Sequence, residues 1–559
     1  MFFFFANAFP VQANAEEISL EKTNPSSKAL QHVLHAEYAF FQGDFVAALD
    51  QLKKAVKEDP TSPYLHLRLA LEFARIGDLD QSMLTAKKAL ENDPSYWEAT
   101  FFLAKLYALK QEFDQSVALF DQLLERGDLD EPSIMDIRFS LSSVYIDMGK
   151  LKEAQFLLEN IVREDDEHLF AYYYLGRVYA EQLLFSKSVQ AYEKTVQINP
   201  EFIAAWKALG FIHEYLGNHD QSLHAFEQAA HYQPSDLEVH RYLMDLYLQT
   251  GKIEQAAKVA QTMVQYYPDL SVFQTRLGLF YYQLKNFEQS KEIFEQLVKK
   301  FPDQTDQFYY LAIVENQLGM KKEARTHLKK VSREAENYKN AVIALSMMLG
   351  EIEKFNDAEH VLKEGLKDRP NTTEFILSLS SLYLRTNQFS KARKVLERSI
   401  SVNQSNESLW FALAEVYEKY GDFTAQEQSL RKVLAINANH AYALNYLGYT
   451  YAERGIKLGE AERLILRALE LAPQDAYIQD SLGWVYFKQE QYQKAVDQLK
   501  VAVDNAPDEP VILEHYAQAL TKIKDFQKAR DYYQKLIDMV EDNHDRSKYQ
   551  QTLETISDH

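Results

Sequence analysis

Proline returns at a fixed interval along much of this chain. The interval is 34 residues, and it separates the prolines of three series: Pro60 and Pro94; Pro200, Pro234, Pro268 and Pro302; Pro473 and Pro507. Because a helix cannot continue through an interior proline, a constant spacing marks the border between equivalent structural units. A period of this length predicts a stack of repeated units, even though an ordinary chain of 559 residues would divide into several globular domains.

Two columns of small residues run through the fifteen units that this period defines between residues 29 and 543. The first column lies at the eighth position of a unit and the second lies twelve residues later, as in the pairs Gly176/Ser188, Gly210/Ser222 and Gly278/Ser290. Met244 interrupts the first column and Gln426 interrupts the second. Small side chains allow two helix backbones to approach closely, and apolar residues surround both columns at helical spacing. Each unit is therefore predicted to be a pair of packed helices.

Many units also carry a glycine or an asparagine where the first helix must end. These residues are Gly43, Gly77, Gly149, Gly217, Gly251, Gly319, Asn387 and Gly421. Glycine and asparagine adopt the left-handed conformation that commonly terminates a helix. We therefore expect a tight turn between the two helices of a unit.

The units resemble the tetratricopeptide repeat. The resemblance is clearest between Ile203 and Asp236, where the consensus residues appear in order: Trp206, Leu209, Gly210, Gly217, Ser222, Phe226, Ala229 and Pro234. It covers about nine-tenths of the chain and implies an all-α, superhelical solenoid of about fifteen helix pairs. Residues 544–559 are polar and are expected to form a helix or tail that caps the last pair.

The resemblance also implies where a partner would bind. In this family the first helices line a concave groove, and the fifth and ninth positions of each unit face it. Aromatic and arginine side chains at these positions are suited to anchoring a protein partner. The candidate residues are Phe101, Phe139, Tyr173, Arg177, Phe211, Arg241, Tyr309, Phe411, Tyr449 and Trp484. Phe139, Phe211, Tyr449 and Trp484 are expected to contribute most, and the alternative is that some of these rings only pack between repeats.

Composition excludes several classes of function. Asp and Glu outnumber Lys and Arg by 82 to 61, so nucleic acid is not expected as a partner. The chain has no cysteine, and its 15 histidines are scattered without metal-ligand spacing. No phosphate-binding loop or acid/base pair stands out. The sequence thus predicts no catalytic residue, no metal, no cofactor and no enzymatic activity.

The N-terminus differs from the rest of the chain. Residues 1–15 combine an apolar start with Ala13-Asn14-Ala15, which is typical of a signal-peptidase site, and a polar leader (residues 16–28) follows. No Lys or Arg precedes the phenylalanine run, so a longer natural start or a disordered apolar tail stays open. Use of the site would place the protein in the periplasm or outside the cell, and non-use in the cytoplasm. No later segment is apolar enough to be a transmembrane span.

The segment Ala443–Val496 bears a weaker resemblance to bacterial envelope repeat proteins, some of which act as protease adaptors. We therefore expect a non-enzymatic scaffold or adaptor that binds one or more proteins in a bacterial envelope. The alternative is a component of polysaccharide export or binding whose groove rings stack on sugars. The sequence leaves open the identity of the partner, its form as a peptide or a folded domain, and the oligomeric state.

Overall fold

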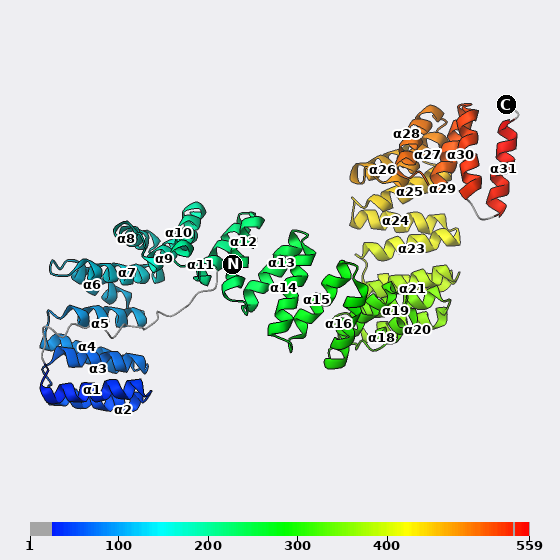
Figure 1. Cartoon of the computed structure of the whole chain (residues 1–559). Helices are drawn as coiled ribbons and strands as arrows, with labels where there is room; N and C mark the ends of the chain where they lie inside the picture. The colour runs from blue at the N-terminus through cyan, green and yellow to red at the C-terminus, as the bar shows by residue number, and fades with distance from the viewer. Residues whose placement is uncertain (1–24, 540–542, 558–559) are drawn as a thin grey trace. The chain divides into compact units, whose positions relative to one another are not determined.

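The structure is a computed structural model that describes residues 25–539 and 543–557. The predicted cleavage site at Ala13-Asn14-Ala15 lies outside the described residues. The described residues form thirty-one α-helices, and no described residue lies in a strand (Figure 1).

Along the chain, the first and second helices of the predicted repeats alternate. The first helices are α1 (Ser27–Phe41), α3 (Pro63–Arg75), α5 (Trp97–Leu109), α7 (Glu131–Asp147), α9 (Leu169–Glu181), α11 (Ile203–Tyr215), α13 (Leu237–Gln249), α15 (Ser271–Gln283), α17 (Asp306–Gln317), α19 (Tyr338–Glu351), α21 (Thr373–Arg385), α23 (Glu407–Tyr420), α25 (Ala441–Glu453), α27 (Ala476–Lys488) and α29 (Pro510–Lys522). The second helices are α2 (Phe45–Glu58), α4 (Leu79–Asn92), α6 (Phe113–Leu124), α8 (Leu151–Glu164), α10 (Phe185–Ile198), α12 (His219–Tyr232), α14 (Ile253–Tyr266), α16 (Phe287–Lys300), α18 (Lys321–Leu328), α20 (Phe355–Asp368), α22 (Phe389–Val402), α24 (Phe423–Ile436), α26 (Leu458–Leu471), α28 (Tyr492–Asn505) and α30 (Phe526–Met539).

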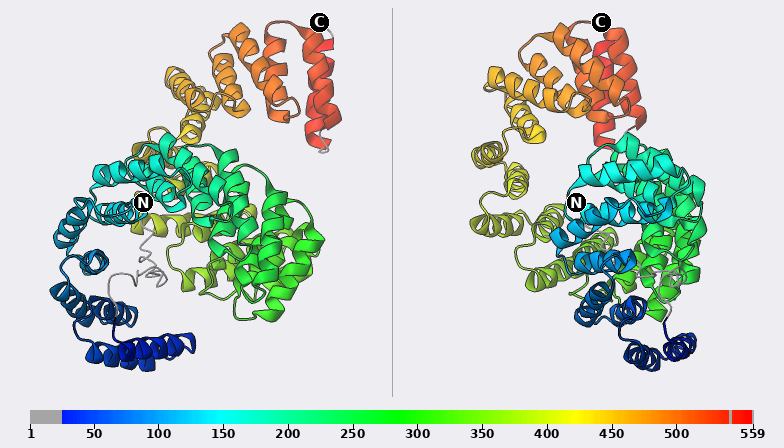
Figure 2. Two further views of the ribbon diagram at one scale, coloured as in Figure 1. Left: turned by 60° about the vertical axis from the view of Figure 1, so that its left-hand side comes forward. Right: turned by 90° about the vertical axis from the view of Figure 1, so that its left-hand side faces the viewer.

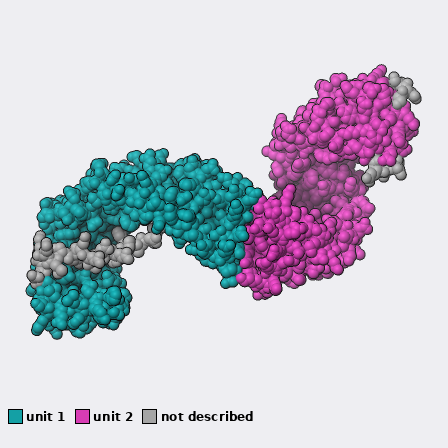
Figure 3. Space-filling view, viewed as in Figure 1, with its two compact units in different colours: residues 1–273 teal, residues 274–559 magenta. Residues whose placement is uncertain are grey.

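These helices make fifteen pairs, which confirms the predicted all-α solenoid, and within each of the two compact units described below successive pairs stack beside one another (Figures 1 and 2). A final helix, α31 (Asn543–Ser557), packs against α30 and buries Tyr549 and Ile556. The chain divides into two compact units, residues 1–273 (unit 1) and residues 274–559 (unit 2), with the boundary inside α15 (Figure 3).

The core of each unit is a series of local clusters built from consecutive helices. In unit 1, one cluster joins Ala104 of α5, Phe120 of α6 and Leu141 of α7. In unit 2, another joins Leu447 of α25 and Ile465 of α26 to their neighbours in α24 and α27. Each pair thus buries its apolar surface on adjacent pairs, as repeat architectures do.

Every helix pair turns through a left-handed residue at the same repeat position. The eight turn residues predicted from the sequence all have positive φ, which confirms that expectation. The same position is left-handed in all fifteen pairs, with φ between 55° and 83°, and in six pairs it is neither glycine nor asparagine. Those six residues are Gln111, Leu183, Lys285, Glu353, Glu490 and Lys524.

The first small column packs closely against the second helix of the same pair, and in five pairs the two columns are joined directly. A Cβ atom added to Gly210 would lie 2.7 Å from the ring of Phe226, and one added to Gly483 would lie 2.5 Å from Leu499. Serines of the second column also form a hydrogen bond across the pair, since the Ser222 hydroxyl donates to the Gly210 carbonyl at 2.8 Å. Four further pairs share this bond at 2.6–2.8 Å: Ser82 to Ala70, Ser116 to Ala104, Ser188 to Gly176 and Ser290 to Gly278.

None of the helices in the described part of the chain combines the length and the apolar character that a membrane crossing requires.

Candidate partner-binding faces

Unit 1 and unit 2 each contain several repeats. We call the surface formed by the first helices of these repeats the first-helix face of unit 1 or of unit 2. In unit 1 this face carries a cluster of five aromatic rings from α7, α9 and the turn before α11. Phe139 lies 5.5 Å from Tyr174, Tyr173 lies 5.0 Å from Phe202, and Phe202 lies 6.1 Å from Phe170, measured between ring centroids. Phe170 is 50% exposed, whereas Tyr173 is half-buried. The structure thus brings the predicted Phe139 and Tyr173 together but offers Phe170 as the accessible ring.

Arg177 lies beside this cluster and is already paired. Its Nε donates to Glu181 at 2.9 Å. Burial opposes the charged form of Arg177, but the hydrogen bond and the charge of Glu181 outweigh it and raise the pKa of Arg177. Burial also raises the pKa of Asp147, an effect that the charge of Arg177 opposes. Arg177 therefore serves first to balance two carboxylates.

Phe211 and Arg241 meet on the same face through a residue that the sequence analysis did not single out. The ring of Tyr242 lies 4.8 Å from Phe211 and 5.0 Å from the guanidinium carbon of Arg241. Arg241 is exposed and Phe211 is half-buried. Phe101 is half-buried further along the unit, with the Lys105 ammonium 5.3 Å from its ring.

Unit 2 holds the other predicted residues. Phe411 is half-buried and stacks on His440 at 5.3 Å, and the half-buried Tyr309 lies 5.6 Å from Tyr310. Tyr449 is half-buried too. Burial raises its pKa, and the charges of Glu453 and Asp480 add to the effect. Its hydroxyl therefore stays protonated and can donate a hydrogen bond at physiological pH.

The expectation that Trp484 is an exposed ring is wrong, because only 5% of its surface is accessible. Its indole stacks on His515 of the next first helix at 4.0 Å and on Phe487 at 4.7 Å. Its Nε1 donates to Glu453 of the preceding first helix at 2.7 Å. Trp484 therefore connects three successive repeats as a core residue.

A buried acid–imidazole pair lies next to Trp484. The Asp480 carboxylate is 2.9 Å from Nδ1 of His515, and both side chains are almost fully buried. Burial raises the pKa of Asp480, although the bond to His515 acts in the opposite direction. Glu514 differs from Asp480. Burial also acts to raise the pKa of Glu514, but hydrogen bonds from Lys548 and Tyr549 outweigh burial, so the pKa of Glu514 is lowered.

The accessible apolar residues of unit 2 occupy a position that the sequence analysis did not consider. Tyr442, Tyr477 and Val511 are each the second residue of their repeat, in α25, α27 and α29, and are 60%, 56% and 49% exposed. Phe170 holds the equivalent position in unit 1. Reading the second position of every repeat, alongside the fifth and ninth, would have found this exposed row.

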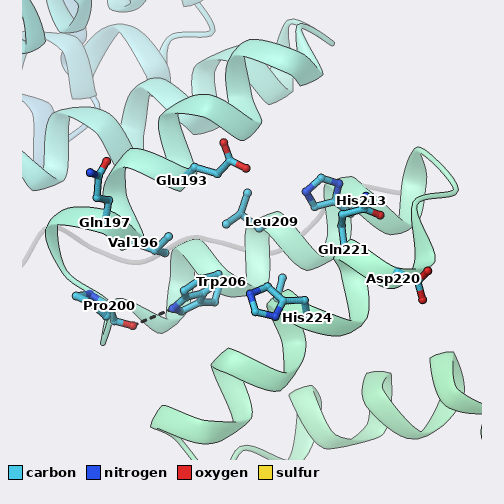
Figure 4. A pocket seen from close by; sticks show the side chains of 11 residues that line it. Glu193, Val196, Gln197, Pro200, Trp206, Leu209, His213, Asp220, Gln221 and His224 are labelled. Atoms are coloured by element: carbon cyan, nitrogen blue, oxygen red, sulfur yellow. Dashed lines mark hydrogen bonds between the residues drawn. The ribbon is translucent and has the colours of Figure 1, made fainter.

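A separate pocket of about 640 Å³ lies between α10, α11 and α12 of unit 1 (Figure 4). Trp206 and Leu209 form its apolar wall, and Glu193 and His213 are among its polar groups. The Trp206 indole donates to the Pro200 carbonyl at 2.8 Å, which fixes the ring in place. Within the described ranges, no three His, Asp or Glu side chains gather closely enough to hold a metal ion.

Comparison with known proteins identifies the repeat. Models of the tetratricopeptide repeat match residues 33–95, 67–131, 215–275, 274–303 and 377–441, and the model of anaphase-promoting complex, cyclosome, subunit 3 matches residues 456–536. The chain is a tetratricopeptide repeat (TPR) protein. This assignment agrees with the fifteen helix pairs and with the close contact between the two small columns.

Two curated relatives share parts of the sequence. TPR repeat-containing protein PA4667 of Pseudomonas aeruginosa is 44% identical over 13% of this chain and 12% of its own length. TPR repeat-containing protein YpiA of Bacillus subtilis is 26% identical over 27% of this chain and 36% of its own length. Among solved structures, Naa15/Naa10 bound to HypK-THB aligns over 94% of both chains with 14% identity and a TM-score of 0.39. The segments that match the two curated relatives, PA4667 and YpiA, span about a third or less of the length of those relatives.

Proposed function

We propose that this TPR protein is a non-enzymatic scaffold of a bacterial cell envelope, and that it holds one or more protein partners on its first-helix faces. The observation that carries the proposal is the row formed by Tyr442, Tyr477 and Val511. Each is about half exposed at the same position of three successive first helices. Soluble proteins seldom expose large apolar side chains in an ordered series unless something binds there.

The surroundings of the row suit an anchor for a partner. Tyr477 is already oriented, because its hydroxyl donates to Glu509 at 2.9 Å. The bond to Glu509 also restricts the Tyr477 side chain before binding, so less side-chain freedom is lost when a partner contacts it. The chain carries a net charge of −21, which favours a partner segment that combines basic and apolar side chains.

A family mode of binding that uses a free lysine on the first-helix face is not supported. Lys207 holds the fifth position of its repeat, but its ammonium already pairs with Glu238 at 2.5 Å and with Asp236 at 3.4 Å. The ninth position of that repeat is Phe211. Recognition of a peptide carboxylate at this point would first require breaking both ion pairs.

Site-specific photo-crosslinking tests the proposal. A photoreactive phenylalanine analogue replaces Tyr477 in the full chain, and Val501 on the second helix α28, which is 44% exposed, provides the matched control. We expect a protein adduct from position 477 and none from position 501. The identified partner should then lose affinity by about 5- to 30-fold for Tyr477→Ala, as an anchor worth about 1–2 kcal/mol would. Equal adducts at both positions, or an unchanged affinity, would refute the proposal.

The polysaccharide alternative and the envelope location each have a test of their own. Retention of glycans on an array by the full chain, lost in Tyr477→Ala, would favour polysaccharide binding in place of a protein partner. For the envelope location, N-terminal sequencing of the fractionated native protein should find Glu16 as the first residue. Recovery of an intact Met1 in the cytosol would place the scaffold in the cytoplasm.

A further inference from the structure

A tyrosine–glutamate pair recurs between successive repeats. The eleventh residue of a repeat donates its phenol hydrogen to a glutamate twenty residues earlier, on the second helix of the preceding repeat. Tyr179 bonds Glu159 at 2.7 Å and Tyr417 bonds Glu397 at 2.9 Å. Tyr247 bonds Glu227 in the same way. Each bond thus ties a first helix to the second helix of the preceding repeat.

The repeat of α11 keeps the glutamate but has lost the phenol. Glu193 stands twenty residues before the eleventh position, and that position is His213. Among the described residues, Nδ1 of His213 is buried and has no hydrogen-bond partner. In Figure 4 the Glu193 carboxylate and the His213 ring stand apart, with Leu209 between them. The pair that closes the neighbouring repeats is therefore open here.

Glu193 and His213 both line the pocket of about 640 Å³. Trp206 forms one wall, and the ring of His224 meets it edge-on at 6.0 Å. Burial lowers the pKa of His213, although the charge of Glu193 opposes this effect, so the imidazole is mainly neutral near pH 7. A neutral imidazole accepts a hydrogen bond at one nitrogen, and the carboxylate accepts at both oxygens. The site thus combines apolar walls and an open volume with one accessible acceptor, the exposed carboxylate of Glu193.

We propose that this pocket binds a tyrosine side chain of a partner protein, which replaces the phenol that this repeat lacks. The ring would pack on Trp206 and Leu209, and its hydroxyl would donate to the Glu193 carboxylate. A phenylalanine would fill the same space but would leave the carboxylate without a donor. A phosphotyrosine would be repelled by Glu193 and by Asp220, which also lines the pocket.

This inference does not rest on the first-helix faces. Most of the pocket's polar groups lie on the second helices α10 and α12, whereas the exposed row of the proposed scaffold lies on α25, α27 and α29. Failure of one binding surface therefore leaves the other untouched.

The test uses p-cresol as the probe for a tyrosine side chain and toluene as its counterpart without a hydroxyl. The full chain is labelled with 5-fluorotryptophan, and Trp206→Phe identifies the fluorine signal of Trp206 among the 4 tryptophans. We expect p-cresol to shift that signal saturably with a Kd of about 1–10 mM, the range for a ligand of this size. Toluene should bind at least about tenfold more weakly because it cannot donate to the acceptors.

Two variants and one matched control locate the site. His213→Tyr should restore the bond to Glu193, occupy the place proposed for the bound phenol and abolish the p-cresol shift. His219→Tyr makes the same exchange on an exposed residue that does not line the pocket, and it should leave p-cresol binding unchanged. Should His213→Tyr fail to fold by circular dichroism, Glu193→Leu provides the second test. It should remove the preference for p-cresol over toluene.

A pair of blocked tripeptides then distinguishes a protein tyrosine from a free phenol. Acetyl-Ala-Tyr-Ala-amide should shift the Trp206 signal, and acetyl-Ala-Phe-Ala-amide should do so at least about tenfold more weakly. Any of three results would overturn the proposal: p-cresol and toluene of equal affinity, a p-cresol shift that persists in His213→Tyr, or binding of p-cresol without binding of the tyrosyl tripeptide.

Discussion

Tyr451 donates its hydroxyl hydrogen to Oε1 of Glu427 at 2.7 Å, and this bond joins α25 to the second helix of the preceding repeat. The same oxygen accepts from Lys457 at 2.9 Å and from Arg431 at 3.0 Å. Burial raises the pKa of Glu427, but the bonds from Lys457, Tyr451 and Arg431 outweigh it and lower the pKa to about 2. One carboxylate therefore collects three donors at the boundary between two repeats.

This lowered pKa predicts an acid-sensitive repeat boundary. The carboxylate stabilises the fold fully above its usual pKa of about 4.3, and the stabilisation is lost as the pH falls toward 2. Lys457 and Arg431 are partly exposed, so solvent screening limits the contribution to about 1 kcal/mol. Glu427→Gln should thus lower the melting temperature by about 1–2 °C at pH 7. Circular dichroism should show this difference shrinking progressively as the pH falls from about 5 toward 2, and a constant difference would contradict the assignment.

The close contact at Gly210 predicts intolerance of bulk. Because a Cβ would already lie 2.7 Å from the Phe226 ring, Gly210→Leu should destabilise the pair α11/α12 by about 1–3 kcal/mol. Gly459→Leu is the matched control, since no atom lies within 4 Å of its added Cβ and its φ is not positive. Hydrogen exchange should rise in α11, α12 and their neighbours for the first variant only. Equal exchange in the two variants would show that the columns do not meet as described.

The left-handed turn predicts an opposite response to substitution at two equivalent positions. Leu183 has φ of 61°, where a branched side chain is strained, so Leu183→Gly should stabilise the protein by about 0.5–1 kcal/mol despite the greater freedom of the unfolded chain. Gly217 has φ of 74°, and Gly217→Leu should be destabilising by about 1 kcal/mol. Urea denaturation measures both, and effects of the same sign would argue against the turn.

Trp484 and Tyr477 should differ sharply when each is cut back to alanine. Trp484 is 5% exposed and spans three repeats, so Trp484→Ala should cost about 3–5 kcal/mol of stability. Tyr477 is 56% exposed, and Tyr477→Ala should stay within about 0.5 kcal/mol of the wild type. Thermal melts separate the two, and comparable losses would mean that Tyr477 is also a core residue.

Periodicity predicted the helix pairs and the small columns, and residue type predicted eight of the fifteen left-handed turn residues, because each depends on a contact within one repeat. Gly210 and Ser222 illustrate this, since they belong to a single repeat and recur at fixed spacing. The candidate site was harder to predict, because exposure at a repeat position depends on the residues of adjacent repeats. Trp484 is buried by His515 of the next repeat, while the exposed Tyr477 stands seven residues before it.

The bonds described above fall into two sets. The serine–carbonyl bond, as between Ser222 and Gly210, closes a single helix pair, whereas the tyrosine–glutamate bond, as between Tyr179 and Glu159, links one pair to the next. A force applied along a stack would therefore reach the links between pairs before it reached the pairs themselves. We therefore expect stretching within a unit to widen the spacing between neighbouring helix pairs while each pair keeps its shape.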